Sequence, residues 1–297
     1  MKKASLVLIV ICALLGSVAY FGLRSQPLST YTPSILRVGL LPSQDVARLR
    51  ERFVPLLDYL AEEIDIEIKL IVATDYGHIL QLFRNNQIDL AHFGGFGFVQ
   101  AYAFYDAEPL VMREIDTRFT SWFLVRSDNP AKNISEMRGG RFAFGSKLST
   151  SGHLMPRHFM KSHQQISPEE FFSELRYSGA HDKTVDSIYK GDVDLGVANP
   201  FIVKAMLKDG RLQEGALRVI WETPPYSDYV WAVHNNLDKD IKAQLLNAFL
   251  ALDATNIKHK RILSNLNSSG FLPAGAQDFE SLKEISSSLG LLKRGLR

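Results

Sequence analysis

Three hydroxyl-bearing residues stand side by side near the middle of this chain, Ser149, Thr150 and Ser151, and Gly152 follows them directly. They lie after a predicted strand, residues 141–146, and before a predicted helix that begins near Gly152. Ser149 or Thr150 alone is enough to cap the N-terminus of that helix. Three hydroxyls in a row place several O–H donors beside the free N–H groups at the positive helix end, an arrangement that holds phosphate-like oxyanions. The stretch therefore predicts a helix cap, and an anion site is the sharper hypothesis.

Sequence signals for catalysis, metal binding or nucleotide binding are weak in this chain. The sequence has no G-x-S-x-G elbow, no P-loop and no H-E-x-x-H motif. His153, His158 and His163 are spaced five apart, so a helix turns each from the last by about 140 degrees, and they share no face for a metal. The segment "HFGGFGF" (residues 92–98) lacks nucleotide-loop spacing, and we expect a tight turn that brings backbone near a cleft. An enzyme, a metal site or a cofactor is therefore not expected.

The amino-acid composition limits the classes of protein to which the chain can belong. The 297 residues are 46% hydrophobic and 22% charged, which is globular composition with room for two domains. The formal net charge of +2 comes from scattered Lys and Arg, and a nucleic-acid partner would need a clustered basic face. Cys12 is the only cysteine and lies in the apolar N-terminal segment. The rest of the chain therefore has no internal disulfide and no thiol nucleophile.

The N-terminal segment, residues 1–24, predicts export. Lys2 and Lys3 precede a stretch without charges from Ala4 to Leu23. Two interpretations remain open: a cleaved signal peptide with small residues at Ser17–Ala19, or a retained membrane anchor of roughly 20 apolar residues. Because the basic residues precede the apolar stretch, both export the remainder. Residues 25–34 are rich in Ser, Thr and Pro and predict a linker.

Strand-like and helix-like segments alternate through the rest of the chain, which predicts an α/β fold with parallel sheets covered by helices. Two blocks share a pattern: "NNQIDLAHFG" and "KGDVDLGVAN" each place an Asp at the start of a predicted strand, and each strand ends in small residues. We interpret them as two similar α/β units. Strands are predicted at 35–42, 66–73, 88–94, 121–127, 141–146, 175–179, 193–199, 217–223 and 229–235. Helices are predicted at 45–63, 76–87, 134–137, after 152, 181–191 and within 238–267.

A resemblance to a known family rests on six motifs that occur in this order: "RVGLLPSQDVARLRERFVPLLDYL", "VATDY", "QIDLAHFG", "LSTSGHLMP", "SGAHD" and "GDVDLG". From about Arg37 to Leu252 the chain resembles the phosphate, phosphite and phosphonate substrate-binding proteins of ABC transporters. The resemblance implies a two-lobed type II periplasmic-binding-protein fold, each lobe a mixed, mainly parallel sheet flanked by helices, joined by hinge strands. Lobe one would comprise residues 35–120 plus 231–297, and lobe two residues 121–230.

The resemblance also implies which side chains hold the anion. Tyr76 would donate its hydroxyl from lobe one, the three hydroxyl residues would form the oxyanion cradle, and His181 would reach the same oxyanion. Asp228 matches a family acid near the return strand, on a looser alignment. The implied ligand-binding set is Tyr76, Ser149, Thr150, Ser151, His181 and Asp228.

Four further residues are expected to line the cleft: Phe93, Gly94, Phe119 and Phe201. Two of them depart from the family pattern. Phe119 stands where many phosphonate binders have a second cleft tyrosine, so a hydroxyl donor is lost. Phe201 stands where aminoalkylphosphonate binders place a glutamate for the ligand amine, and a buried ammonium without a partner is costly. We therefore expect a ligand without an amino group, and phosphate, phosphite, a simple alkylphosphonate or a different anion or solute remain open.

The function that the resemblance implies is the capture of a small oxyanion (phosphate, phosphite or phosphonate type) for uptake through an ABC permease of the inner membrane. The protein would be periplasmic, either soluble or anchored to the membrane by its N-terminal segment. The alternative is a membrane-anchored sensory binding protein that reports its ligand to a signalling partner such as a histidine kinase. Neither hypothesis includes catalysis, a cofactor, a metal or a nucleic acid.

Overall fold

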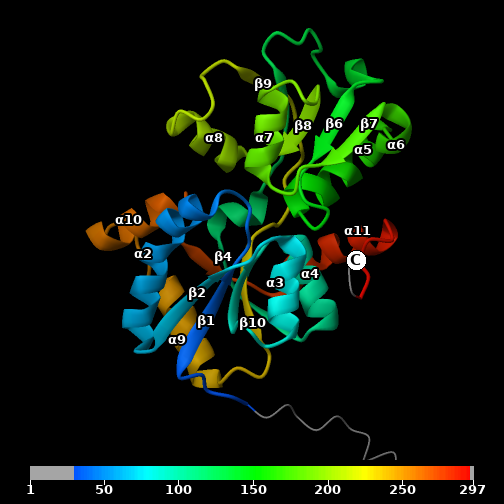
Figure 1. The fold of residues 1–297 in the computed structure, drawn as a ribbon. Helices are drawn as coiled ribbons and strands as arrows, with labels where there is room; N and C mark the ends of the chain where they lie inside the picture. Colours follow the sequence, from blue (N-terminus) through cyan, green and yellow to red (C-terminus); the bar gives the residue numbers. More distant parts are fainter. Residues whose placement is uncertain (1–29, 295–297) are drawn as a thin grey trace, which may run out of the picture. The chain divides into compact units, whose positions relative to one another are not determined.

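The structure is a computed structural model that describes residues 30–294. The predicted signal peptide or anchor and Cys12 lie outside the described residues. Within residues 30–294, no helix is long and apolar enough to cross a membrane. The chain from Thr32 onward forms one unit, in which the strands make two sheets, each flanked by helices (Figure 1).

The first sheet has six strands in the order β11-β4-β10-β3-β1-β2. Its β1 pairs in parallel with β2 and β3, whereas β10 runs antiparallel to β3 and β4, and β11 antiparallel to β4. The sheet is therefore mixed, as predicted, and we call its lobe lobe one. The strands are β1 Ile35–Leu40, β2 Glu67–Val72, β3 Leu90–Phe93, β4 Ala107–Arg113, β10 Val230–His234 and β11 Phe271–Pro273.

The second sheet has five strands in the order β7-β6-β8-β5-β9 and belongs to lobe two. Its β6 pairs in parallel with β7 and β8, and β5 runs antiparallel to β8 and β9. The exact lobe boundaries stay a prediction. The strands are β5 Trp122–Arg126, β6 Arg141–Phe144, β7 Glu174–Tyr177, β8 Leu195–Ala198 and β9 Leu217–Glu222.

Helices cover both sheets with apolar faces. In α2 the buried residues Leu49, Phe53, Leu56 and Leu60 recur at helical spacing, and the helix continues through Pro55. The α-helices are α2 Val46–Ile64, α3 Tyr76–Arg84, α4 Gly95–Phe104, α5 Met155–Gln164, α6 Pro168–Phe171, α7 His181–Tyr189, α8 Pro200–Lys208, α9 Lys239–Leu250, α10 Ile257–Asn265 and α11 Glu280–Ser288. The short helical turns are η1 Glu114–Arg118, η2 Ile134–Met137, the π-helical η3 Thr150–Leu154 and η4 Ala276–Phe279.

The same Asp–Arg interaction occurs once in each lobe. In lobe one, Asp89 before β3 accepts the backbone N–H of Arg37 (2.7 Å) and forms an ion pair with its guanidinium. In lobe two, Asp194 before β8 accepts the backbone N–H of Arg141 (2.8 Å) and pairs with its guanidinium in the same way. The predicted similarity of the two α/β units is thus visible in their hydrogen bonds. It also makes α3 and α7 equivalent, since each follows the edge strand of a parallel three-strand set.

The structure corrects the prediction of a tight turn at residues 92–98. The helix α4 begins inside this segment, at Gly95, with Gly94 as its N-cap residue. Phe96, Phe98 and Val99 are all buried, so α4 has no polar stripe in its first two turns, and sequence periodicity gave no helical signal. The strands β4 and β11 and the helix α8 were also missed.

Candidate functional site

The hydroxyl cluster lies at the turn between β6 and α5. Ser149 Oγ accepts a hydrogen bond from the Gly152 N–H at 2.9 Å, so the predicted helix cap is confirmed and Ser149 is the capping residue. The first turn is π-helical: the Leu154 N–H donates to Ser149 O at 3.0 Å. π-Helical turns frequently occur at functional sites because they redirect backbone and side chains.

Lobe one meets this cluster with the N-terminus of α4. Thr150 Oγ1 accepts the Phe96 N–H at 2.9 Å, and Asp228 Oδ1 accepts the Gly95 N–H at 3.0 Å. Gly94 borders both side chains, since a Cβ there would lie in ordinary van der Waals contact with Thr150 Oγ1 (3.4 Å) and Asp228 Oδ1 (3.5 Å). Two helix N-termini, those of α4 and of the turn before α5, therefore face the same buried space, and such ends favour anions.

Three buried polar atoms at this site have no hydrogen-bond partner among the described residues: Tyr76 OH, Ser151 Oγ and Asp228 Oδ2. Their residues are at most 4% exposed. Buried polar groups are almost always hydrogen-bonded in proteins, and leaving one unpaired costs free energy. Unpaired atoms on residues from three separate parts of the chain are what a site for a polar ligand would contain.

His181 presents a neutral N–H donor to the same space. The side chain is fully buried, and its Nδ1 accepts the Asn199 N–H at 3.2 Å. The proton of the neutral ring therefore lies on Nε2, which is 3.5 Å from Ser149 Oγ. Burial lowers the pKa of His181 to about 4, so the ring is uncharged at neutral pH.

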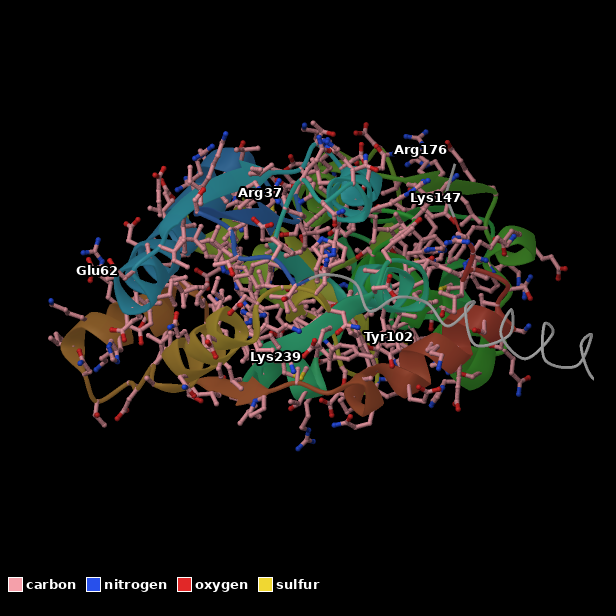
Figure 2. The ribbon with its side chains drawn as sticks, turned by 90° about the horizontal axis from the view of Figure 1, so that it is seen from below. Arg37, Glu62, Tyr102, Lys147, Arg176 and Lys239 are labelled. Carbon is pink, nitrogen blue, oxygen red and sulfur yellow. The ribbon has the colours of Figure 1, made fainter. Side chains whose placement is uncertain are left out.

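Within residues 30–294, the cations nearest in sequence to the cradle have other partners. Lys147, labelled in Figure 2, extends over the ring of Tyr177, and Arg157 pairs with Glu169. In the part of the chain that the structure describes, no hydrogen bond or ion pair joins a Lys or Arg to the hydroxyls of the cradle. Residues 30–294 also contain no group of His, Cys, Asp or Glu that could hold a metal ion. An anion here would be held by hydrogen-bond donors and helix ends.

Asp228 is the acidic residue of the predicted ligand-binding set. Burial raises its pKa from 3.8 to about 7, and the Gly95 N–H and the Thr150 and Ser151 hydroxyls oppose this rise. Repulsion by the negative charge of the Asp116 carboxylate adds to the rise. Asp228 therefore supplies a single acceptor among many donors.

The six residues of the predicted ligand-binding set are brought together. Ser149 touches His181, and its hydroxyl lies close enough to Tyr76 to oppose the burial that raises the pKa of that phenol. Asp228 shares the α4 N-terminus with Thr150. Their roles toward a ligand stay a prediction.

The four predicted cleft residues occupy different places. Gly94 lies between Thr150 and Asp228, as described above. Phe93 packs on Phe83 in the core of lobe one, with ring centroids 5.4 Å apart. Phe119 is buried against Phe201, whose ring also contacts the cations of Arg113 and Lys204.

A groove at the outer edge of the site contains residues of both lobes. Its volume is about 1120 Å³, and Asp45, Asp75 and Asp182 are among its lining residues. Two hydrogen bonds hold the lobes together beside it: the Asp45 N–H donates to Asp182 Oδ2 (2.9 Å), and the His181 N–H donates to Ser43 O (3.2 Å). The site is therefore closed in this structure, and its ligand would enter when the lobes part.

Sequence reasoning missed Ser121, Asn199, Tyr226 and Tyr229. All four are buried. Tyr229 OH accepts a hydrogen bond from the Asn199 side chain (3.2 Å), and Ser121 Oγ meets Tyr226 OH at 2.5 Å. Asn199 ends the pattern "KGDVDLGVAN" but was not assigned to the site. The other three stand in none of the motifs quoted above, because each acts through a partner that is distant in sequence.

Comparison with known proteins identifies the relatives of this chain. The family described as "ABC transporter, phosphonate, periplasmic substrate-binding protein" matches residues 38–279. A Prochlorococcus marinus (strain MIT 9301) protein named "Probable ABC transporter phosphite binding protein PhnD1" is 30% identical over 295 residues, covering 94% of this chain and 98% of the relative. The "Phosphate-import protein PhnD" of Mycolicibacterium smegmatis is 26% identical over 239 residues, covering 76% of this chain and 74% of the relative.

Solved structures agree with these relatives. PhnD1 from Prochlorococcus marinus (MIT 9301) in complex with methylphosphonate matches with a TM-score of 0.80 and 30% identity, covering 87% of this chain and 99% of that chain. The likeness confirms the predicted type II periplasmic-binding fold. The relatives named here are transport proteins and give no support to the sensory alternative.

Proposed function

This chain belongs to the family of periplasmic substrate-binding proteins of phosphonate ABC transporters, and we propose that its ligand is a small phosphorus oxyanion without an amino group. The family is non-enzymatic and serves uptake through a permease. Relatives named for phosphite, for phosphate import and for a methylphosphonate complex set the range of ligands. The observation that carries the proposal is the convergence of Tyr76 OH, Ser151 Oγ and Asp228 Oδ2, all buried and unpartnered.

In this proposal each residue has a distinct role. Tyr76, Ser151 and His181 donate hydrogen bonds to the oxyanion from different directions. Ser149 and Thr150 already accept backbone N–H groups, so their own hydroxyl protons are free to point at the ligand. Asp228 accepts one hydrogen bond from a protonated ligand oxygen, or donates one when it is itself protonated.

The cradle is tested by removing two of its hydroxyls. We expect phosphite, phosphate or methylphosphonate to raise the melting temperature of the wild-type protein, and Ser149→Ala with Thr150→Ala to weaken binding at least about tenfold, since hydrogen bonds to charged groups are worth about 1.5–3 kcal/mol each. Thermal-shift titration measures both. The matched control is Ser162→Ala with Ser187→Ala, whose exposed hydroxyls donate to helix carbonyls. Unchanged affinity in the cradle variant, or no oxyanion that stabilises the wild type, would refute the proposal.

The surroundings of Phe201 predict weak binding of a phosphonate that carries an amino group. Phe201 has Phe119, Arg113 and Lys204 as neighbours, and Arg113 is paired with Asp116. A ligand ammonium there would meet the cation of Lys204 and an acid that Arg113 already neutralises. We expect 2-aminoethylphosphonate to bind at least about tenfold more weakly than propylphosphonate, which has the same size and no charge at that end. Calorimetric titration with the two ligands measures the ratio, and equal affinities would contradict the assignment.

A further inference from the structure

We propose that Ser121 and Tyr226, which lie on the two segments that join the lobes, form a relay that positions Ser151 in the anion cradle. The relay sets ligand affinity without contacting the ligand, so both are positioning residues. The inference rests on the proposed function, because it assigns the relay to the same site. It starts from a carbonyl of the π-helical turn whose next donor in the helical series would be a proline.

That carbonyl belongs to Ser151. In the turn, the Leu154 N–H donates to Ser149 O and the Met155 N–H donates to Thr150 O, each five residues back. The next donor in this series would be residue 156, which is Pro156 and has no N–H. A buried carbonyl without a donor is costly, so Ser151 O needs a partner from outside the helix.

Ser121 is that partner. Its Oγ donates to Ser151 O at 2.7 Å and lies 2.5 Å from Tyr226 OH. A serine hydroxyl has one proton, and Ser121 has given it to the carbonyl. Tyr226 must therefore donate to Ser121 Oγ, which gives the chain of bonds one direction, from Tyr226 through Ser121 to Ser151.

The backbone of the joining segments fixes both relay residues. Phe119 and Tyr226 exchange N–H···O bonds of 2.8 and 2.9 Å. The Ser121 N–H donates to Thr223 Oγ1 (2.9 Å), and the Thr223 N–H donates to Ser121 O (3.1 Å). Ser121 is fully buried and Tyr226 is 8% exposed, so water does not compete for these bonds.

The relay ends at Ser151, whose Oγ has no hydrogen-bond partner among residues 30–294. Its hydroxyl lies near both Asp228 and Tyr226, where it opposes the rise in pKa of each. The direction of this hydroxyl follows from the Ser151 backbone that Ser121 holds. The relay also places a hydroxyl beside Phe119, the position at which the chain lacks a cleft tyrosine.

The test is a double-mutant cycle, measured by calorimetric titration of phosphite and methylphosphonate. We expect Ser121→Ala to weaken binding about tenfold and Tyr226→Phe severalfold, because a buried acceptor loses its donor or the donor loses its orientation. On a Ser151→Ala background we expect either change to have almost no further effect, because the hydroxyl that the relay positions is gone. Tyr226→Phe keeps the ring and serves as the decisive variant if Ser121→Ala does not fold.

The matched control is Ser286→Ala in α11. Ser286 is fully buried and its hydroxyl donates to Lys283 O at 2.9 Å, so this variant loses stability and keeps its affinity. The relay is refuted if Ser121→Ala and Tyr226→Phe behave like this control, or if their effects add fully to that of Ser151→Ala. Absence of oxyanion binding by the wild-type protein would instead refute the proposed function, so the two failures are distinguishable.

Discussion

The affinity for phosphite is expected to fall about tenfold for each pH unit above pH 7, and Asp228→Asn is expected to remove this dependence. Phosphate-type oxyanions lose their second proton near pH 6, and the pKa of Asp228 is about 7. Above pH 7 the Asp228 carboxylate is therefore negative and the ligand is a dianion. The free oxygen of Asp228 would then face a ligand oxygen with no proton between them. Binding then requires the uptake of one proton, which produces the tenfold slope.

Asparagine at position 228 would replace this acceptor with an amide that can donate to a dianion. We therefore expect Asp228→Asn to bind more weakly than the wild type at pH 6 and to show no slope between pH 7 and pH 9. Calorimetric titration across this range measures both proteins, and the control is Asp58→Asn on the exposed face of α2. A wild-type affinity that stays constant from pH 7 to pH 9 would contradict the shared proton.

The same carboxyl group links ligand binding to stability. Its pKa is raised in the folded protein, so the folded state holds its proton more tightly than the unfolded state does. The free energy of unfolding therefore decreases as pH rises from 3.8 to about 7, by about 4 kcal/mol at about 1.4 kcal/mol for each pH unit. In the same measurements, the ligand-free Asp228→Asn protein should have a higher melting temperature than the wild type at pH 8. In the proposed function, the carboxyl group that lowers stability is also the acceptor for the ligand.

The parts of this fold that could be predicted from sequence are those with local signals. The strand β1 and the helix α2 have the right apolar periods, and Ser149 caps its helix as its residue type implies. The helix α4 has almost uniformly buried residues in its first turns, and such a segment shows no period. The anion cradle could be proposed from the sequence because its three hydroxyls are adjacent, and its role stays a prediction.

The rest of the site depends on contacts between distant residues. The bond from Ser121 to Ser151 spans 30 positions, and the contact of Ser121 with Tyr226 spans 105. No local pattern marks a serine whose only role is to satisfy a carbonyl orphaned by Pro156. The pKa of Asp228 likewise follows from burial at the α4 N-terminus, which no residue type reveals.

Gly152→Ala is expected to weaken oxyanion binding more than about 100-fold. A Cβ at this position would lie 2.9 Å from Ser149 Oγ, 3.1 Å from Gly145 Cα and 3.1 Å from His181 Cε1. Ser149 and Gly145 are both tied to Gly152, because Ser149 Oγ accepts the Gly152 N–H and the Gly145 N–H is bonded to Gly152 O at 2.7 Å. The added methyl group must therefore displace the cap or the histidine ring, and overpacking of this kind costs about 1–3 kcal/mol or more.

Gly97→Ala is the matched control for this substitution. Gly97 is also buried, but it lies inside α4, and a Cβ there would meet only the Phe93 ring at an ordinary 3.6 Å. Alanine favours a helix over glycine by about 1 kcal/mol, so this variant should keep its affinity and its stability. Thermal-shift and calorimetric titrations of the two variants distinguish loss of the anion cradle from loss of the fold. Because Gly152 packs against the cap, the strand turn and His181 at once, wild-type affinity in Gly152→Ala would show that the anion is held elsewhere.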